Sequence, residues 1–234
     1  MKKIIVKDQH EGALVGYNII KETLENGKLN VFGLATGSTP LALYEVLRES
    51  DLDFSNTISI NLDEYVSLAP DHDQSYNYFM NEHLFNAKPF KKSYLPDGSN
   101  LDADAVCSTY EDIIKANPVD LQILGIGTNG HIGFNEPGSE FDSRTRKVEL
   151  TDETIEANAR FFESKEDVPT HAYSMGIGTI LDTKKILLFA YGESKADAIY
   201  KLFNEAQTTD LPASALQNHP DVTIIIDEEA ASKL

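Results

Sequence analysis

The sequence has one cysteine, no tryptophan and few basic residues. With Cys107 alone, no disulfide can form within the chain, which favours a reducing compartment such as the cytoplasm. Lysine and arginine number 20 against 38 aspartates and glutamates, a formal net charge of −18. A field of this sign disfavours nucleic acid and anionic membrane surfaces, so we expect neither as a partner. Any anion site must therefore be built locally from backbone N–H groups, hydroxyls and a few cations.

Long apolar runs are also missing. No stretch approaches the roughly 20 apolar residues of a membrane span. Only the run of three apolar residues Ile4, Ile5 and Val6 stands directly before Lys7, too few for the core of about 7–15 residues in a signal peptide. We therefore expect a soluble, cytoplasmic protein, and a length of 234 residues suits one α/β domain.

Helix-like and strand-like segments alternate along the chain. Helical spacing predicts helices over 11–26, 41–50, 75–85, 103–116 and 195–206, and short apolar runs predict strands over 29–35, 57–62, 120–127, 185–192 and 222–227. Apolar strands separated by helices predict a single-domain, Rossmann-like three-layer sandwich over residues 1–234, with a mostly parallel sheet and helices on both faces. The polar stretch 150–165 suggests an exposed helix or a helical lid, at about 140–170. Ligands of such sheets lie beyond the carboxyl ends of the strands.

The first candidate loop holds Thr36, Gly37, Ser38 and Thr39, between a strand and a helix. Pro40 fits the first helical position, so we expect Ser38 or Thr39 near the N-cap. Free N–H groups, the helix dipole and three hydroxyls suit a phosphate. The lysine of a P-loop is absent. From these residues alone, an ordinary capped helix start fits equally well.

A second loop carries two adjacent acids, Asp63 and Glu64, directly after an apolar strand. A carboxylate at a buried strand end loses solvation, so its pKa rises. Such a group can accept a proton near neutral pH. For an isolated pair of acids, a solvated turn is the commoner alternative.

The third loop, residues 125–138, is rich in glycine. GIGTNG matches the dinucleotide pattern GxGxxG, but Gly133, Pro137 and Gly138 break the helix that this pattern requires. A catalytic loop with His131 and Glu136 fits better, because a carboxylate can orient an imidazole. Metal ligation is the rival, and with no second histidine or cysteine cluster nearby we predict no metal site.

Two basic residues complete the candidate site. Arg160 lies in the polar stretch, and Lys195 begins a helix, where the dipole disfavours a cation unless an anion is shared. Considered alone, Lys195 is interpreted equally well as an ordinary surface lysine. The strand-end loops together support one site more strongly than any single feature does.

Five motifs, LATGSTP, NLDEYVSL, LGIGTNGHIGFNEPGS, SRTR and ARFF, resemble those of glucosamine-6-phosphate deaminases (isomerising), in that family's order and over essentially the whole chain. GHIGFNEP together with LDEY is highly specific. The resemblance implies conversion of α-D-glucosamine 6-phosphate and water to D-fructose 6-phosphate and ammonia, in the catabolism of amino sugars such as N-acetylglucosamine. It implies no cofactor.

The resemblance also implies residue roles. Asp63 would move a proton between C2 and C1 of the opened sugar, and His131 would open the pyranose ring with support from Glu136. Asn129 stands where the family often has aspartate; an amide can hydrogen-bond the imidazole but brings no charge, so we expect a different optimum pH or ring-opening rate. The phosphate would be held by Thr36, Gly37, Ser38, Thr39, Gly130, Arg160 and Lys195.

Assembly and regulation follow from the same resemblance. Longer relatives carry a C-terminal extension, which in allosteric hexamers helps to form an effector site for N-acetylglucosamine 6-phosphate. Ser139 and Arg146 match effector-site positions, but Val148 replaces a lysine. We therefore expect weak or absent allostery and favour a monomer over a homo-oligomer.

Two other functions are compatible with this fold. One is a 6-phosphogluconolactonase, which shares the fold and the phosphate loop and would release no ammonia. The other is a sugar-phosphate sensor, which would need a DNA-binding segment, and the chain has no spare basic helix-turn-helix region.

Overall fold

The computed structural model describes all 234 residues. Its centre is a seven-stranded sheet in the order β1-β10-β9-β6-β2-β3-β5, with all neighbouring strands parallel. The strands are β1 (Lys2–Val6), β2 (Val31–Leu34), β3 (Ile58–Asn61), β5 (Lys92–Tyr94), β6 (Leu121–Leu124), β9 (Lys185–Ala190) and β10 (Val222–Asp227). The central strands are apolar on both faces because helices cover both, as predicted.

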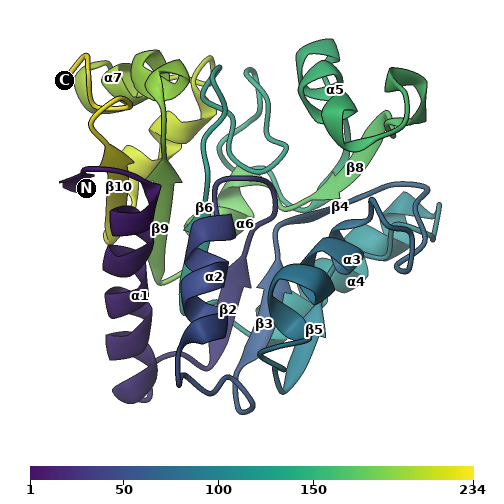
Figure 1. Cartoon of the computed structure of the whole chain (residues 1–234). Helices are drawn as coiled ribbons and strands as arrows, with labels where there is room; N and C mark the ends of the chain where they lie inside the picture. Colours follow the sequence, from purple (N-terminus) through teal and green to yellow (C-terminus); the bar gives the residue numbers. More distant parts are fainter.

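The helices form two layers around this sheet. They are α1 (Gln9–Glu25), α2 (Leu41–Glu49), α3 (Tyr76–Met80), α4 (Ala103–Ala116), α5 (Asp152–Asn158), α6 (Ile177–Leu181) and α7 (Ala196–Asn204). Figure 1 shows α1 and α2 side by side in front of the sheet. The crossovers through α4 and α6 run back across the sheet in the opposite direction, so right-handed connections put these helices on the other face. The predicted three-layer α/β fold is confirmed.

A second sheet was not predicted. It is antiparallel, in the order β4-β8-β7, with β4 (Asp63–Tyr65), β8 (His171–Ser174) and β7 (Arg146–Glu149). The chain passes from the end of β3 through Leu62 directly into β4. Asp63, predicted in a loop after a strand, is instead the first residue of a strand and pairs with Ser174.

Other boundaries also differ from the prediction. The expected strand at 120–127 ends at Leu124, because residues 127–131 form a turn in which the N–H of Gly127 bonds the carbonyl of His131. The expected helix at 75–85 is α-helical over α3 and continues as a π-helical turn over Asn81–Phe85. The polar stretch forms α5 and two 3₁₀ turns, Ala159–Phe161 and Lys165–Asp167. No helix has the length and apolar character needed to cross a membrane.

The main core is an apolar cluster of 43 buried residues on the two faces of the large sheet. Such close packing holds the carboxyl ends of the strands in fixed positions. The loops that leave β2, β3 and β6 therefore start from a rigid edge, and at this edge the candidate site lies.

Candidate active site

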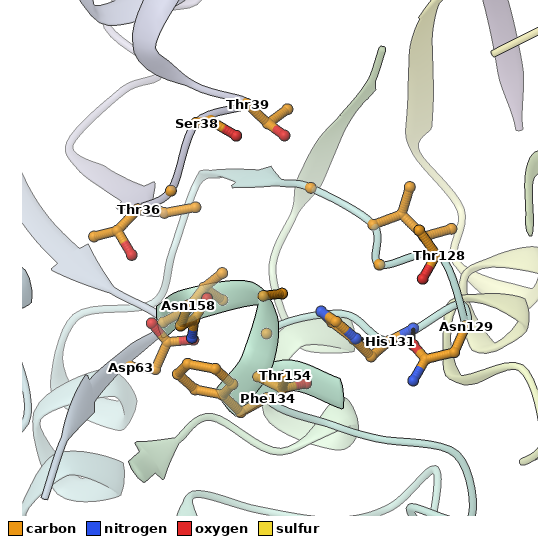
Figure 2. A pocket seen from close by; sticks show the side chains of 18 of the residues that line it. Thr36, Ser38, Thr39, Asp63, Thr128, Asn129, His131, Phe134, Thr154 and Asn158 are labelled. Atoms are coloured by element: carbon orange, nitrogen blue, oxygen red, sulfur yellow. Dashed lines mark hydrogen bonds between the residues drawn. The ribbon is translucent and has the colours of Figure 1, made fainter. Parts of the chain in front are cut away.

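A cavity of about 270 Å³ opens at the carboxyl edge of the large sheet. This volume is near the lower end of the range of about 300–1,000 Å³ for small-molecule sites. The structure brings the predicted loops together here: the cavity lining includes Thr36, Gly37, Ser38, Thr39, Asp63, Asn129, His131, Arg160 and Lys195. Figure 2 shows hydroxyls along one side, Asp63 at another and the imidazole of His131 facing the same space.

In the loop after β2, the side chains of Ser38 and Thr39 make no hydrogen bonds to the rest of the protein. Pro40, not Ser38 or Thr39, is the N-cap of α2, with φ −81° and ψ −4°, and no side chain caps the helix. Pro40, expected at the first helical position, is therefore one position earlier in the helix than predicted, and Thr39 lies next to the N-cap. The hydroxyls of Ser38 and Thr39 form no hydrogen bond in the chain and line the cavity. Gly37 has φ +93°, a conformation that favours glycine.

Two cations lie beside this loop. The Lys195 ammonium is partly buried and donates to the carbonyl of Ile126 at 2.6 Å. Burial and the nearby charge of Arg160 lower the pKa of Lys195. Arg160 is exposed on the 3₁₀ turn after α5, with its guanidinium carbon 4.6 Å from the centre of the Phe161 ring. Neither cation has a carboxylate within 4.0 Å, although the chain is strongly acidic, so this end of the cavity suits an anion.

The carboxyl group of Asp63 has no hydrogen-bond donor in the protein. Its side chain is buried, with the residue 7% exposed, lines the cavity and makes no hydrogen bond within the chain. Burial, followed by the charge of Glu64, raises the pKa of Asp63 to about 8. The carboxyl can therefore gain and lose a proton near neutral pH.

Glu64 has a different environment from its neighbour. Its Oε1 accepts the N–H groups of Tyr65 at 2.8 Å and Tyr76 at 2.9 Å, and its Oε2 accepts that of Asn77 at 2.9 Å. Burial raises the pKa of Glu64 to about 7, although these N–H groups act to lower it. Glu64 thus ties α3 to β4, whereas the carboxyl of Asp63 has no such partner.

His131 is held by Asn129. The Asn129 Oδ1 lies 2.9 Å from His131 Nδ1 and accepts the His131 backbone N–H at 3.1 Å. The Asn129 amide nitrogen donates to Glu136 Oε2 at 2.9 Å, which assigns the oxygen to the imidazole side. An amide oxygen only accepts, so Nδ1 carries the proton and Nε2 is the basic nitrogen.

Glu136 lies behind this pair, outside the cavity lining. Its Oε2 is 3.5 Å from His131 Nδ1, and its Oε1 accepts the hydroxyl of Thr154 at 2.6 Å. Burial acts to raise the pKa of Glu136, but the hydrogen bond and charge of His131, with the bonds from Thr154 and Asn129, lower it to about 2. Glu136 therefore stays ionised and orients the imidazole.

Two glycines make this loop possible. A Cβ at Gly127 would overlap the His131 ring, so only glycine lets the imidazole lie there. Gly130 has φ +85°, and a Cβ there would overlap Leu211. Gly130, predicted as a phosphate ligand, lies outside the cavity lining, because its N–H bonds the carbonyl of Gly127 at 3.0 Å in the turn.

Several lining residues carry no clear sequence signal. The cavity is completed by Tyr76, Thr128, Phe134, Glu153, Thr154 and Asn158, among others. Tyr76 stacks on Phe134 with ring centres 6.2 Å apart. Asn158 donates to the Tyr65 hydroxyl at 2.9 Å. These contacts tie α3 to the loop after β6, and α5 to β4 of the small sheet, whose strands were not predicted.

The positions matched to an effector site lie near the loop of His131. Arg146 donates to Asn135 Oδ1 at 2.8 Å and to the Ser139 hydroxyl at 3.4 Å. Val148 packs against the small apolar cluster around Tyr65. Weak or absent allostery stays a prediction. The chain holds no group of three or more His, Cys, Asp or Glu side chains arranged to bind a metal ion.

Comparison with known proteins shows the family to which the chain belongs. Residues 13–225 match the family described as glucosamine-6-phosphate isomerases/6-phosphogluconolactonase. The chain belongs to this family. The family resemblance drawn from the motifs and the prediction of an enzyme are thereby confirmed.

Individual relatives match over their full length. A glucosamine-6-phosphate deaminase of Latilactobacillus sakei subsp. sakei is 63% identical over all of this chain and 99% of the relative. The enzyme of that name from Streptococcus thermophilus is 58% identical, with both chains fully covered. A solved structure of a monomeric glucosamine-6-phosphate deaminase has a TM-score of 0.97 at 42% identity over both whole chains.

The lactonase branch is more distant. A 6-phosphogluconolactonase from Leishmania guyanensis has a TM-score of 0.80 and 21% identity over all of this chain and 98% of that one. At this identity the likeness establishes the shared fold alone.

Proposed function

We propose that the protein converts glucosamine 6-phosphate and water to fructose 6-phosphate and ammonia. One observation carries the proposal: a single small cavity has unpaired cations and free hydroxyls at one end, and an unbonded carboxyl and an oriented imidazole at the other. Full-length relatives at 58–63% identity bear the name of this deaminase.

In this proposal the phosphate anchors the substrate. It binds the loop from Thr36 to Thr39 and is clamped by Arg160 and Lys195, since a guanidinium suits phosphate geometry. Binding energy from the remote phosphate then fixes the sugar's first two carbons beside the reacting side chains. We place the reaction in cytoplasmic amino-sugar catabolism, performed by a monomer.

Ring opening comes first. The Nε2 of His131 takes the proton of the O1 hydroxyl and delivers a proton to O5 as the C1–O5 bond breaks, which leaves the open aldehyde. Asn129 and the ionised Glu136 keep the imidazole in the required tautomer throughout.

Isomerisation and deamination follow. Asp63 removes the C2 proton while the aldehyde oxygen gains one, giving an enolamine. Asp63 returns its proton to C1 as the nitrogen loses one, giving a ketimine. Water adds to the C2=N bond and ammonia leaves, which yields the ketone. The steps are proton transfers, cleavage of the C1–O5 bond, addition of water and loss of ammonia. C1 is reduced as C2 is oxidised within the same molecule, so the scheme requires no redox cofactor.

The test is an assay of both products. Purified protein with glucosamine 6-phosphate and EDTA should release fructose 6-phosphate and ammonia in equal amounts. A parallel assay with 6-phosphogluconolactone should show no hydrolysis above background. Lactone hydrolysis without ammonia from the amino sugar would instead support the lactonase function.

The phosphate end has its own test. Arg160→Ala should raise KM for glucosamine 6-phosphate by about ten- to a hundredfold, because a charge-assisted contact to the anion is lost. Lys165→Ala, which removes an exposed lysine of the same region outside the cavity, is the matched control. An unchanged KM in Arg160→Ala would remove Arg160 from the phosphate site.

A further inference from the structure

The capping segment, residues 152–161, consists of α5 and the 3₁₀ turn that follows it. It contributes Thr154, Asn158 and Arg160 to the cavity lining. Thr154 is buried in the first turn of α5, with its hydroxyl oxygen 2.6 Å from Glu136 Oε1. One short segment thus connects the anion end of the cavity to the carboxylate behind the imidazole.

The hydroxyl of Thr154 makes its hydrogen bond outside its own helix. Helical threonines commonly bond a carbonyl one turn back, as Thr23 does with Ile19 at 2.7 Å. Thr154 instead reaches Glu136, which lies 18 residues earlier in the chain. Thr154 lies in the first turn of α5, where no helical residue precedes it by a full turn, so its hydroxyl bonds a side chain of the loop after β6 instead.

The direction of each hydrogen bond is fixed by the chemistry of the groups. Glu136 is ionised and only accepts, so the Thr154 hydroxyl must donate to it. The Thr151 oxygen accepts the Thr154 N–H at 3.2 Å, and its hydroxyl can donate to Thr154 Oγ1 at 3.0 Å. Helix α5 therefore presents a hydroxyl whose proton points at the carboxylate.

From the carboxylate the chain continues to the imidazole. Glu136 Oε2 accepts the amide of Asn129, and Asn129 Oδ1 accepts the Nδ1 proton of His131. Other bonds of the capping segment end elsewhere: Glu153 accepts from Thr128 at 3.1 Å, and Asn158 donates to Tyr65. Thr154 alone in this segment bonds Glu136.

We propose that Thr154 is a positioning residue that holds His131 in line through Glu136 and Asn129. This inference rests on the proposed function. The residue that orients the ring-opening group and the Arg160 cation of the anion end thereby lie on one short segment.

The test compares Thr154→Val, which keeps the shape and removes the hydroxyl, with Thr154→Ser, which keeps the hydroxyl. A bond to a charged group is lost in the valine variant, so kcat should fall by about ten- to a hundredfold while KM changes less than about twofold. The serine variant should recover most of that loss. Ser164→Ala removes an exposed hydroxyl–carboxylate bond nearby, to Asp167, and should behave as the unaltered protein.

A second readout follows the imidazole itself. In ¹⁵N spectra at neutral pH, His131 of the unaltered protein should show a protonated Nδ1, and Thr154→Val should show a mixture of the two tautomers. Thr154→Ala provides the same comparison should the valine variant fail to fold.

Three results would overturn the inference: full turnover in Thr154→Val, an equal loss in Thr154→Ser, or an unchanged tautomer in the valine variant. If the unaltered protein releases no ammonia, the proposed function fails. The tautomer comparison still shows whether the chain of hydrogen bonds orients His131.

Discussion

Two carboxylates on opposite sides of the reacting end of the cavity have opposite surroundings. Asp63, which lines the cavity, is buried with no donor and beside Glu64, and its pKa rises to about 8. Glu136, behind His131, accepts from Thr154 and Asn129, and its pKa falls to about 2. Both are removed from water, so their partners decide the difference. Carboxyls driven apart in this way take different roles, one exchanging protons and one remaining an anion.

The strongest test of this contrast is Asp63→Asn. The amide keeps the size of the side chain but cannot take the C2 proton, so kcat for glucosamine 6-phosphate should fall by about 10³–10⁴-fold. Binding of the substrate, measured by calorimetry, should persist. Asp71→Asn, which changes an exposed aspartate outside the cavity, is the control. Retained activity in Asp63→Asn would refute its role as the base.

The opposite end is tested by His131→Gln. Loss of the imidazole removes the group proposed to open the ring, and kcat should fall by about 10²–10³-fold. An analogue that lacks O5 cannot form the six-membered ring and should lose less. His10→Gln, an exposed histidine on α1, controls for the substitution. Equal losses for both substrates would mean that His131 serves a step after ring opening.

The raised pKa of Asp63 also predicts that ionisation of this group lowers the free energy of unfolding of the unaltered protein by about 2–5 kcal/mol at pH 8. The folded pKa of Asp63 lies above its unfolded value, so the folded state binds more protons between pH 4 and pH 8. Stability from this group is present at low pH and is lost as pH rises through that window. Asp63→Asn removes the loss and should be more stable than the unaltered protein at pH 8, with the gap closing towards pH 4. Urea unfolding at both pH values measures it.

Glu64→Gln is the comparison for this effect. Its carboxylate accepts three N–H groups at the start of α3, and a glutamine cannot accept all of them with the same strength. The raised pKa of Glu64, about 7, predicts a gain at pH 8 by the same linkage, but the weakened N–H bonds oppose it, so Glu64→Gln should gain less stability than Asp63→Asn. An equal gain in both variants would show that burial alone, and not hydrogen bonding, sets the cost of ionising each acid.

The sequence predicts one part of this arrangement well and another poorly. The large sheet follows from apolar runs such as those of β6 and β9, which are long enough to be recognised. The polar β4, Asp63–Tyr65, resembles a turn, and its burial depends on pairing with β8 more than 100 residues later. No local pattern could therefore show that Asp63 lacks donors while Glu64 binds three.

Contacts between segments far apart in the sequence could not be predicted either. Thr154 is one of three hydroxyl side chains in the polar stretch 150–165, and its bond to Glu136 requires the folded positions of α5 and the loop after β6. Pro40, expected as the first helical residue, is the N-cap of α2, and the side chains of Ser38 and Thr39 just before it are free donors. The sequence could therefore identify which residues belong to the site, but not which hydrogen-bond partner each side chain has in the fold.

The smallest expected effect concerns Asn129. In Asn129→Asp the amide donor to Glu136 is lost and a second negative charge lies 2.9 Å from Nδ1. The imidazole should then hold its proton to higher pH, because a nearby opposite charge favours the charged form. The acid limb of kcat/KM, measured from pH 5 to 10, should move up by about one pH unit, with kcat at the optimum changed less than about fivefold. Asn86→Asp adds the same charge on the exposed surface and should leave the profile in place. Superimposable profiles for Asn129→Asp and the unaltered protein would show that Glu136 alone sets the charge around the imidazole.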